Sequence, residues 1–124
     1  MVLKNIIKEK KMKENKLDTI TNLFEGSEIR SIWDRQKEDY YFSVVDVIGI
    51  LTGSNIPKRY WTDLKKKLID EGSQLYENIV QLKMKSNDNK FYKTDAANTK
   101  QLLRLIQSVP SPKTEPFIQW LAHE

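Results

Sequence analysis

The chain has 124 residues, of which 39% are hydrophobic and 31% are charged, and it contains no cysteine. This length suits one domain with a modest core, no apolar run approaches the roughly 20 residues of a membrane span, and the lack of cysteine excludes disulfides and thiolate metal sites. The formal net charge of +4 lies in residues 1–16, which hold six lysines and two glutamates, whereas 15 basic and 15 acidic residues balance from Leu17 onward.

Residues 1–16 are the first predicted segment. They combine many lysines with few apolar side chains, a composition typical of a flexible basic arm rather than of a packed element. We therefore expect a flexible basic arm over residues 1–16 and one folded domain over residues 17–124.

Two strands are expected at residues 20–33 and 40–45, because both segments are rich in β-branched and aromatic residues. The charged residues 34–39 connect them, which predicts an antiparallel hairpin. Asp46 has the side chain of a helix N-cap, so a short helix is predicted over residues 47–51. Residues 52–55 then form the turn into the next element.

Residues 54–72 predict the most clearly bounded helix of the chain. Pro57 suits the first turn of a helix, where its missing N–H costs nothing, and Gly72 suits the position just past the end. Trp61, Leu64 and Leu68 recur at three- and four-residue spacing, so one face should pack on a core. A different face gathers cationic and polar residues, namely Lys58, Arg59, Thr62, Lys65 and Lys66.

A second hairpin is predicted from strands at residues 79–84 and 90–93, joined by the turn-forming residues 86–89. The first strand alternates strictly between two kinds of side chain. The apolar set is Val80, Leu82 and Met84, and the polar set is Gln81, Lys83 and Lys85. This period of two predicts an apolar face toward the core and a basic face toward solvent.

The last third of the chain predicts two helices. Thr94 or Asp95 is expected to cap the first, which runs to about Val109 before the prolines at 110 and 112 end it. Its buried stripe should comprise Leu102, Leu105, Ile106 and Val109. Thr114 is expected to cap the second, in which Phe117, Trp120 and Leu121 face inward. We also expect that the natural protein continues beyond Glu124.

These elements predict an α+β fold, a single small domain in which two short antiparallel hairpins pack with about four helices. The sequence offers little for catalysis, because the only histidine, His123, is expected at an exposed helix end. The glycines are spaced as turn and cap residues rather than as a phosphate-binding loop. We therefore expect no enzymatic activity, no cofactor and no metal site. The tryptophans at 33, 61 and 120 have aliphatic neighbours, which favours core packing over base stacking.

The order of these residues resembles the Bro-N domain, the N-terminal domain of the BRO family of large DNA viruses and of prophage antirepressors. The resemblance covers about residues 24–124, and the Lys-rich arm lies outside it. It rests on Phe24, Ile29, Arg30 and Trp33, followed by three segments that are specific in combination: SVVDVIGILT, SNIPKRYW with LKKKL, and SVPSPKTEPFIQWLA. Family members often have Asp-Gly in the hairpin turn, where this chain has Asp88-Asn89. Asparagine also tolerates a left-handed turn.

The resemblance implies a non-enzymatic DNA-binding module of a phage or prophage antirepressor-type regulator, which would act in the bacterial cytoplasm or at the nucleoid and not at a membrane. From charge we infer that double-stranded DNA is the partner, because residues 58–104 hold eleven bases against six acids. The predicted phosphate contacts are Lys58, Arg59, Lys65, Lys66, Lys83, Lys85, Lys90 and Lys93.

Two alternatives stay open at this point. Residues 18–46 hold seven acids against three bases, so the domain could instead present an acidic surface that sequesters a repressor protein without direct DNA binding. The domain could also be a purely structural unit fused to an unknown effector.

Overall fold

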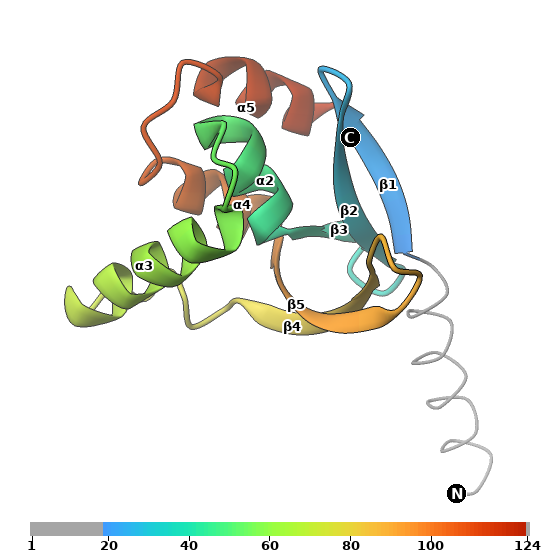
Figure 1. Ribbon diagram of the computed structural model, residues 1–124, viewed down its shortest axis with the longest axis horizontal. Helices are drawn as coiled ribbons and strands as arrows, with labels where there is room; N and C mark the ends of the chain where they lie inside the picture. The colour runs from blue at the N-terminus through green and yellow to red at the C-terminus, as the bar shows by residue number, and fades with distance from the viewer. Residues whose placement is uncertain (1–18, 124) are drawn as a thin grey trace, which may run out of the picture.

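The computed structural model describes residues 19–123, and within that range it shows four helices and one five-stranded antiparallel sheet. The predicted α+β class is confirmed, although the strands form one continuous sheet rather than two separate hairpins. The sheet order is β1-β2-β3-β5-β4 (Figure 1). The elements are β1 Thr19–Phe24, β2 Ser27–Asp34, β3 Asp39–Ser43, α2 Val44–Thr52, α3 Pro57–Asp70, β4 Val80–Lys85, β5 Phe91–Asn98, α4 Thr99–Ile106 and α5 Thr114–Ala122. The predicted basic arm over residues 1–16 lies outside the described residues.

The predicted strand at residues 20–33 is wrong, because this segment folds into two strands. Glu25 and Gly26 have φ values of 50° and 80°, and two consecutive left-handed residues make a tight turn that reverses the chain. β1 then pairs antiparallel with β2 from Thr19 opposite Ile32 to Phe24 opposite Ser27. Glutamate is an unusual first residue for such a turn, so Gly26 was the only signal in the sequence.

The helix predicted at residues 47–51 begins earlier, at Val44, and Asp46 is not its cap. Ser43 has an extended backbone and its hydroxyl accepts a hydrogen bond from the Asp46 N–H at 3.4 Å. Serine and aspartate are both good N-cap residues, and here the aspartate side chain is used elsewhere. At the other end Gly53 is left-handed, with φ 67°, as expected of the residue after a helix.

The predicted caps Thr94 and Asp95 are also wrong, because both residues lie within β5. The strand continues to Asn98, whose side chain accepts from the Gln101 N–H while the Gln101 side chain accepts from the Asn98 N–H. This reciprocal capping box starts α4 at Thr99. The helix ends at Ile106 rather than Val109. Its predicted stripe is nevertheless buried, with Val109 in the turn that follows.

The last helix begins with Thr114 as its first residue, so Thr114 is not the cap. Lys113 occupies the cap position and makes no capping hydrogen bond through its side chain. Phe117 and Leu121 are buried as predicted, whereas Trp120 is half-buried and its Nε1–H donates to the Leu23 carbonyl at 2.8 Å. This bond joins α5 to β1.

The main core lies on one face of the sheet, beneath α2, α4 and α5, which Figure 1 shows on one side of β1–β3. Ile29, Phe42 and Ala97 supply the sheet side of this core. A smaller cluster occupies the other face and contains Ile32, Tyr41, Met84 and Ala96. Because β2 and β4 are not neighbours in the sheet, this shared cluster requires the sheet to curl. Among the predicted core tryptophans Trp61 is buried, but Trp33 is 38% exposed and packs on Tyr40.

Candidate nucleic-acid interface

α3 separates an apolar face from a cationic face, as predicted. Pro57 occupies the first turn, Gly72 is left-handed with φ 70°, and Trp61, Leu64 and Leu68 are buried. The remaining faces are open to solvent. Lys58, Arg59 and Lys66 are exposed, and Lys65, beside the buried stripe, is half-buried.

The β4–β5 hairpin presents a second cationic face. Lys83 of β4 lies directly opposite Lys93 of β5 in the antiparallel register, so both side chains leave the same face with Cβ atoms about 5 Å apart. Lys85 shares this face by strand alternation, whereas Leu82 and Met84 point to the smaller core. Lys83, Lys85 and Lys93 are all exposed, as is Lys90 after the turn.

Asp95 joins these two surfaces. One of its oxygens, Oδ2, accepts from Trp61 Nε1 at 2.8 Å and from Lys65 Nζ at 3.0 Å, and Oδ1 accepts from Gln81 Nε2 at 3.2 Å. Burial raises the pKa of Asp95, but the hydrogen bonds from Trp61, Lys65 and Gln81 outweigh it and hold the pKa below its ordinary value. The carboxylate therefore stays charged and fixes α3 against the hairpin.

Strand alternation places Asp95 on the same face of the hairpin as Lys93 and Lys83. The side of α3 that carries Lys65 consequently borders the cationic face of the hairpin. Figure 1 shows α3 and the β4–β5 hairpin along the same side of the molecule. The fold thus brings two of the predicted basic segments together, although they lie about twenty residues apart in sequence.

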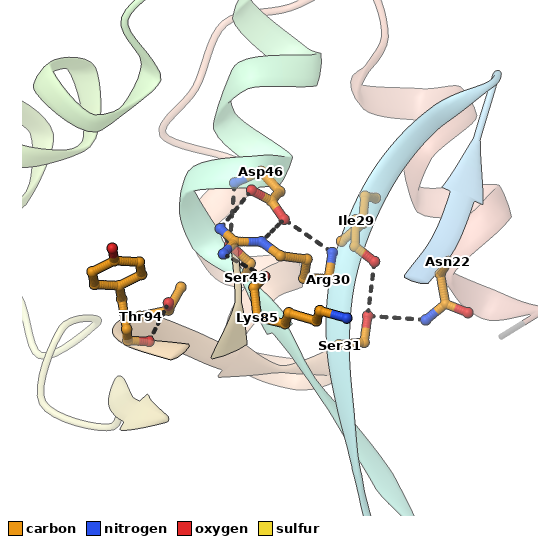
Figure 2. A network of polar contacts seen from close by, with 9 residues as sticks. Asn22, Ile29, Arg30, Ser31, Ser43, Asp46, Lys85 and Thr94 are labelled. Carbon is orange, nitrogen blue, oxygen red and sulfur yellow. Dashed lines mark hydrogen bonds and ion pairs between the residues drawn. The ribbon is translucent and has the colours of Figure 1, made fainter. Parts of the chain in front are cut away.

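Arg30 anchors the far end of β4. Its Nε and Nη2 donate to the two carboxylate oxygens of Asp46 at 2.9 and 3.0 Å, and its Nη1 reaches the Lys85 carbonyl at 3.4 Å. Figure 2 shows this guanidinium between α2 and the strands, with Ser43 as a further partner of Nη2. A planar guanidinium is suited to such a bidentate pair. Arg30 thereby ties β2, α2 and β4 to one another.

The structure changes the role of one predicted DNA contact. Lys65 is already paired with Asp95, and its ammonium also lies 5.8 Å from the centroid of the Trp61 ring. Its charge is therefore partly satisfied within the domain. Within residues 19–123 the other seven predicted contacts form no ion pair. Asp63 and Asp70 are exposed on α3 beside the cationic residues, and they lower the net positive charge of its solvent face.

Sequence reasoning missed Arg30, Asp46 and Asp95 as organising residues. Asp46 and Asp95 were both interpreted as helix caps, because aspartate is common there. A period-two interpretation continued through residues 91–98 would have placed Asp95 on the face of Lys93. No comparable signal in the sequence pairs Arg30 with Asp46, which lies 16 residues later.

A shallow pocket of about 380 Å³ lies between the start of β2 and the α2–α3 turn, where Glu28, Asp46 and Lys113 line it with mixed charge. Residues 19–123 contain no group of three or more His, Cys, Asp or Glu side chains placed to hold a metal ion. No helix in that range has the length and apolar character needed to cross a bilayer.

Residues 28–124 match the family model of the BRO family, N-terminal domain (Bro-N). The chain belongs to this family. The match begins in β2 and spans the hairpin, α3 and all eight predicted DNA contacts. β1 precedes the matched segment of the Bro-N domain. Searches of curated proteins and of solved structures gave no significant match.

Proposed function

We propose that this Bro-N domain binds double-stranded DNA as the non-enzymatic module of an antirepressor-type phage or prophage regulator, in the bacterial cytoplasm or at the nucleoid. The proposed contacts are the seven residues without an ion pair in the described part of the chain, from α3 and from the β4–β5 hairpin, whereas Lys65 is already paired with Asp95. The observation that carries the proposal is the Lys83–Lys93 pair, two exposed like charges directly opposite each other.

Like charges at directly opposed positions destabilise a sheet. Neither lysine has an acidic partner within residues 19–123 that would offset this repulsion. DNA phosphates placed one beside each of the two ammonium groups would offset the repulsion and release condensed counterions from DNA. The exposed Lys58, Arg59 and Lys66 of α3 extend the cationic surface beyond the hairpin.

The test is fluorescence anisotropy of a labelled duplex of about 20 base pairs, titrated with the full chain across a salt series. The double variant Lys83→Ala/Lys93→Ala should reduce the slope of log affinity against log salt by about 1.8, since each phosphate contact contributes about 0.9. The matched control is Arg35→Ala/Lys37→Ala in the β2–β3 turn, which removes the same charge from exposed positions outside α3 and the hairpin. Equal slopes for the two double variants would remove the hairpin from the interface.

A second function has its own observation. Within the described residues β1 is an edge strand whose only strand partner is β2, and the Leu23 side chain is 59% exposed two residues before the acidic turn residue Glu25. The Leu23 carbonyl is taken by Trp120 Nε1–H, so the edge available to another strand lies N-terminal to it. Such an edge can accept a strand from another protein, which suits sequestration of a repressor. This alternative would be supported if the chain bound a purified repressor but no duplex in about 50 mM salt. Leu23→Asp should then abolish the complex with the repressor.

A further inference from the structure

α2 and α3 form two packed helices joined by a turn of four residues, 53–56. They approach closely at Gly49, where an added Cβ would lie 3.3 Å from the Cβ of Pro57. Both helices contribute to the main core, through Ile48 and Leu51 on α2 and Trp61 on α3. Two helices that pack across a short glycine-containing turn are typical of helix-turn-helix motifs, in which the second helix enters the DNA major groove.

The strands around this pair strengthen the inference. β3 leads directly into α2, the β4–β5 hairpin follows α3, and β5 pairs between β3 and β4. This arrangement places a two-stranded hairpin beside the second helix. We call the turn of this hairpin, residues 86–90, the wing. The Asp95 contacts to Trp61 and Lys65 fix the hairpin against α3.

We propose that α3 is the recognition helix, with Arg59, Thr62 and Lys66 toward base edges in the major groove, while the hairpin and wing hold flanking phosphates through Lys83, Lys93 and Lys90. This inference rests on the function proposed above and adds sequence readout to it. Arg59, Thr62 and Lys66 are exposed, and their spacing of three and four residues places them on the face of α3 opposite Leu64.

The side chains on this face have base-reading chemistry. A guanidinium such as that of Arg59 can donate to O6 and N7 of guanine together. The Thr62 hydroxyl donates to the Lys58 carbonyl at 2.9 Å, so its methyl group is free for the thymine methyl. A carboxylate such as that of the exposed Asp63 repels phosphate but accepts from the cytosine amino group. An acidic residue in this position would weaken a surface that contacts only the DNA phosphates. It suits a surface that also contacts base edges.

The experiment begins with selection of duplexes from a library with about 16 randomised base pairs, using the full chain in about 100 mM KCl. The expected result is an enriched consensus that contains guanine. For Arg59→Ala the ratio of the affinities for the consensus and for a mismatched site should be about tenfold smaller, the order expected for the loss of one bidentate base contact. Arg35→Ala removes a guanidinium from the β2–β3 turn and should keep the preference. Circular dichroism checks that both variants are folded.

A second measurement uses the unmodified protein and is independent of variant folding. Replacing guanine by 7-deazaguanine in the consensus removes the N7 acceptor from the major groove and should weaken binding about tenfold. Bound duplexes that yield no consensus would overturn the recognition-helix assignment alone. A consensus that is insensitive to both Arg59→Ala and 7-deazaguanine would do the same. Failure to retain any duplex even in about 50 mM KCl would overturn the proposed function itself.

Discussion

Lys93→Glu should stabilise the domain and weaken its binding to DNA. In the folded chain Lys93 lies directly opposite Lys83, so the substitution replaces a like-charge cross-strand pair with an opposite-charge pair. Asp95 lies two residues along the same face, but Lys65 already neutralises it at 3.0 Å. The new glutamate therefore interacts mainly with Lys83.

The expected size of the stability change follows from the register. Two unit charges about 6 Å apart in water interact by about 0.7 kcal/mol, so changing the sign is worth about 1.4 kcal/mol before screening. Salt near the physiological level screens roughly half of this. We expect a gain of about 0.5 kcal/mol at physiological salt and about 1 kcal/mol at low salt, a rise of a few degrees in Tm. DNA binding should lose one phosphate contact and gain a repulsion, with a fall of one to two units in the salt slope.

Thermal and urea unfolding at low and high salt measure the first effect, and duplex anisotropy measures the second. Lys93→Gln is the matched control and should give about half of each change, because it removes the repulsion without adding attraction. A Lys93→Glu variant that is less stable than the original protein at low salt would refute the geometry of the pair. A stabilised variant with unchanged DNA binding would show that the pair is not at the interface.

Four further predictions concern the polar contacts that hold the elements of the fold together. Asp95→Ala leaves the indole N–H of buried Trp61 without its acceptor and should cost about 2 kcal/mol in urea unfolding at pH 7. Folding lowers the pKa of Asp95, so the stability that its carboxylate contributes is complete above about pH 4 and is lost as the pH falls further. Asp95→Asn has no such titration, and between about pH 5 and pH 2 its free energy of unfolding should fall less than that of the original protein. Arg30→Ala removes the bidentate pair with Asp46 and the bond to the Lys85 carbonyl; we expect a loss of about 2–3 kcal/mol, and a loss below about 0.5 kcal/mol would contradict the anchoring role. Asn98→Ala removes the capping box of α4 and should lower the free energy of unfolding by about 1 kcal/mol in thermal unfolding. Asn98→Asp should retain most of the stability of the original protein, because aspartate is also a good N-cap residue.

The sequence predicted the amphipathic elements well, because burial leaves a periodic signal that needs no knowledge of the partner. The stripes of α3 and α4 were identified residue by residue, including Trp61, Leu64 and Leu105. The alternation of β4 was identified in the same way for its second half, with Met84 fully buried and Lys83 exposed, whereas Val80 at the start of the strand is 36% exposed. The basic residues proposed for DNA binding followed from these periods, since every side chain opposite a core position must face outward.

The errors occurred where local preference and tertiary contacts disagree. Ala96 and Ala97 favour a helix intrinsically, yet both are fully buried in β5, where Ala97 lies opposite Phe42 beneath the helices. A small side chain is required there by packing and not by propensity. Asp46 and Asp95 resemble caps in one dimension, but each is a partner for residues on a different element. Such pairings depend on the sheet order, which a single sequence does not reveal.

The distribution of paired and unpaired cations is the strongest link between fold and function. The cations that form ion pairs in residues 19–123 each join separate elements: Arg30 joins β2 to α2, Lys65 joins α3 to β5, and Lys113 joins the start of α5 to the β1–β2 turn. A domain that used lysine only for solvation would gain by spreading the remaining charges apart. Here Lys83 and Lys93 are instead held face to face, beside a helix whose outer face is also cationic. The β4–β5 register sets the two lysines opposite each other, and Asp95 fixes the hairpin against α3 while neutralising Lys65. This arrangement gives up stability in the free domain, a cost that the proposed binding of a polyanion would offset.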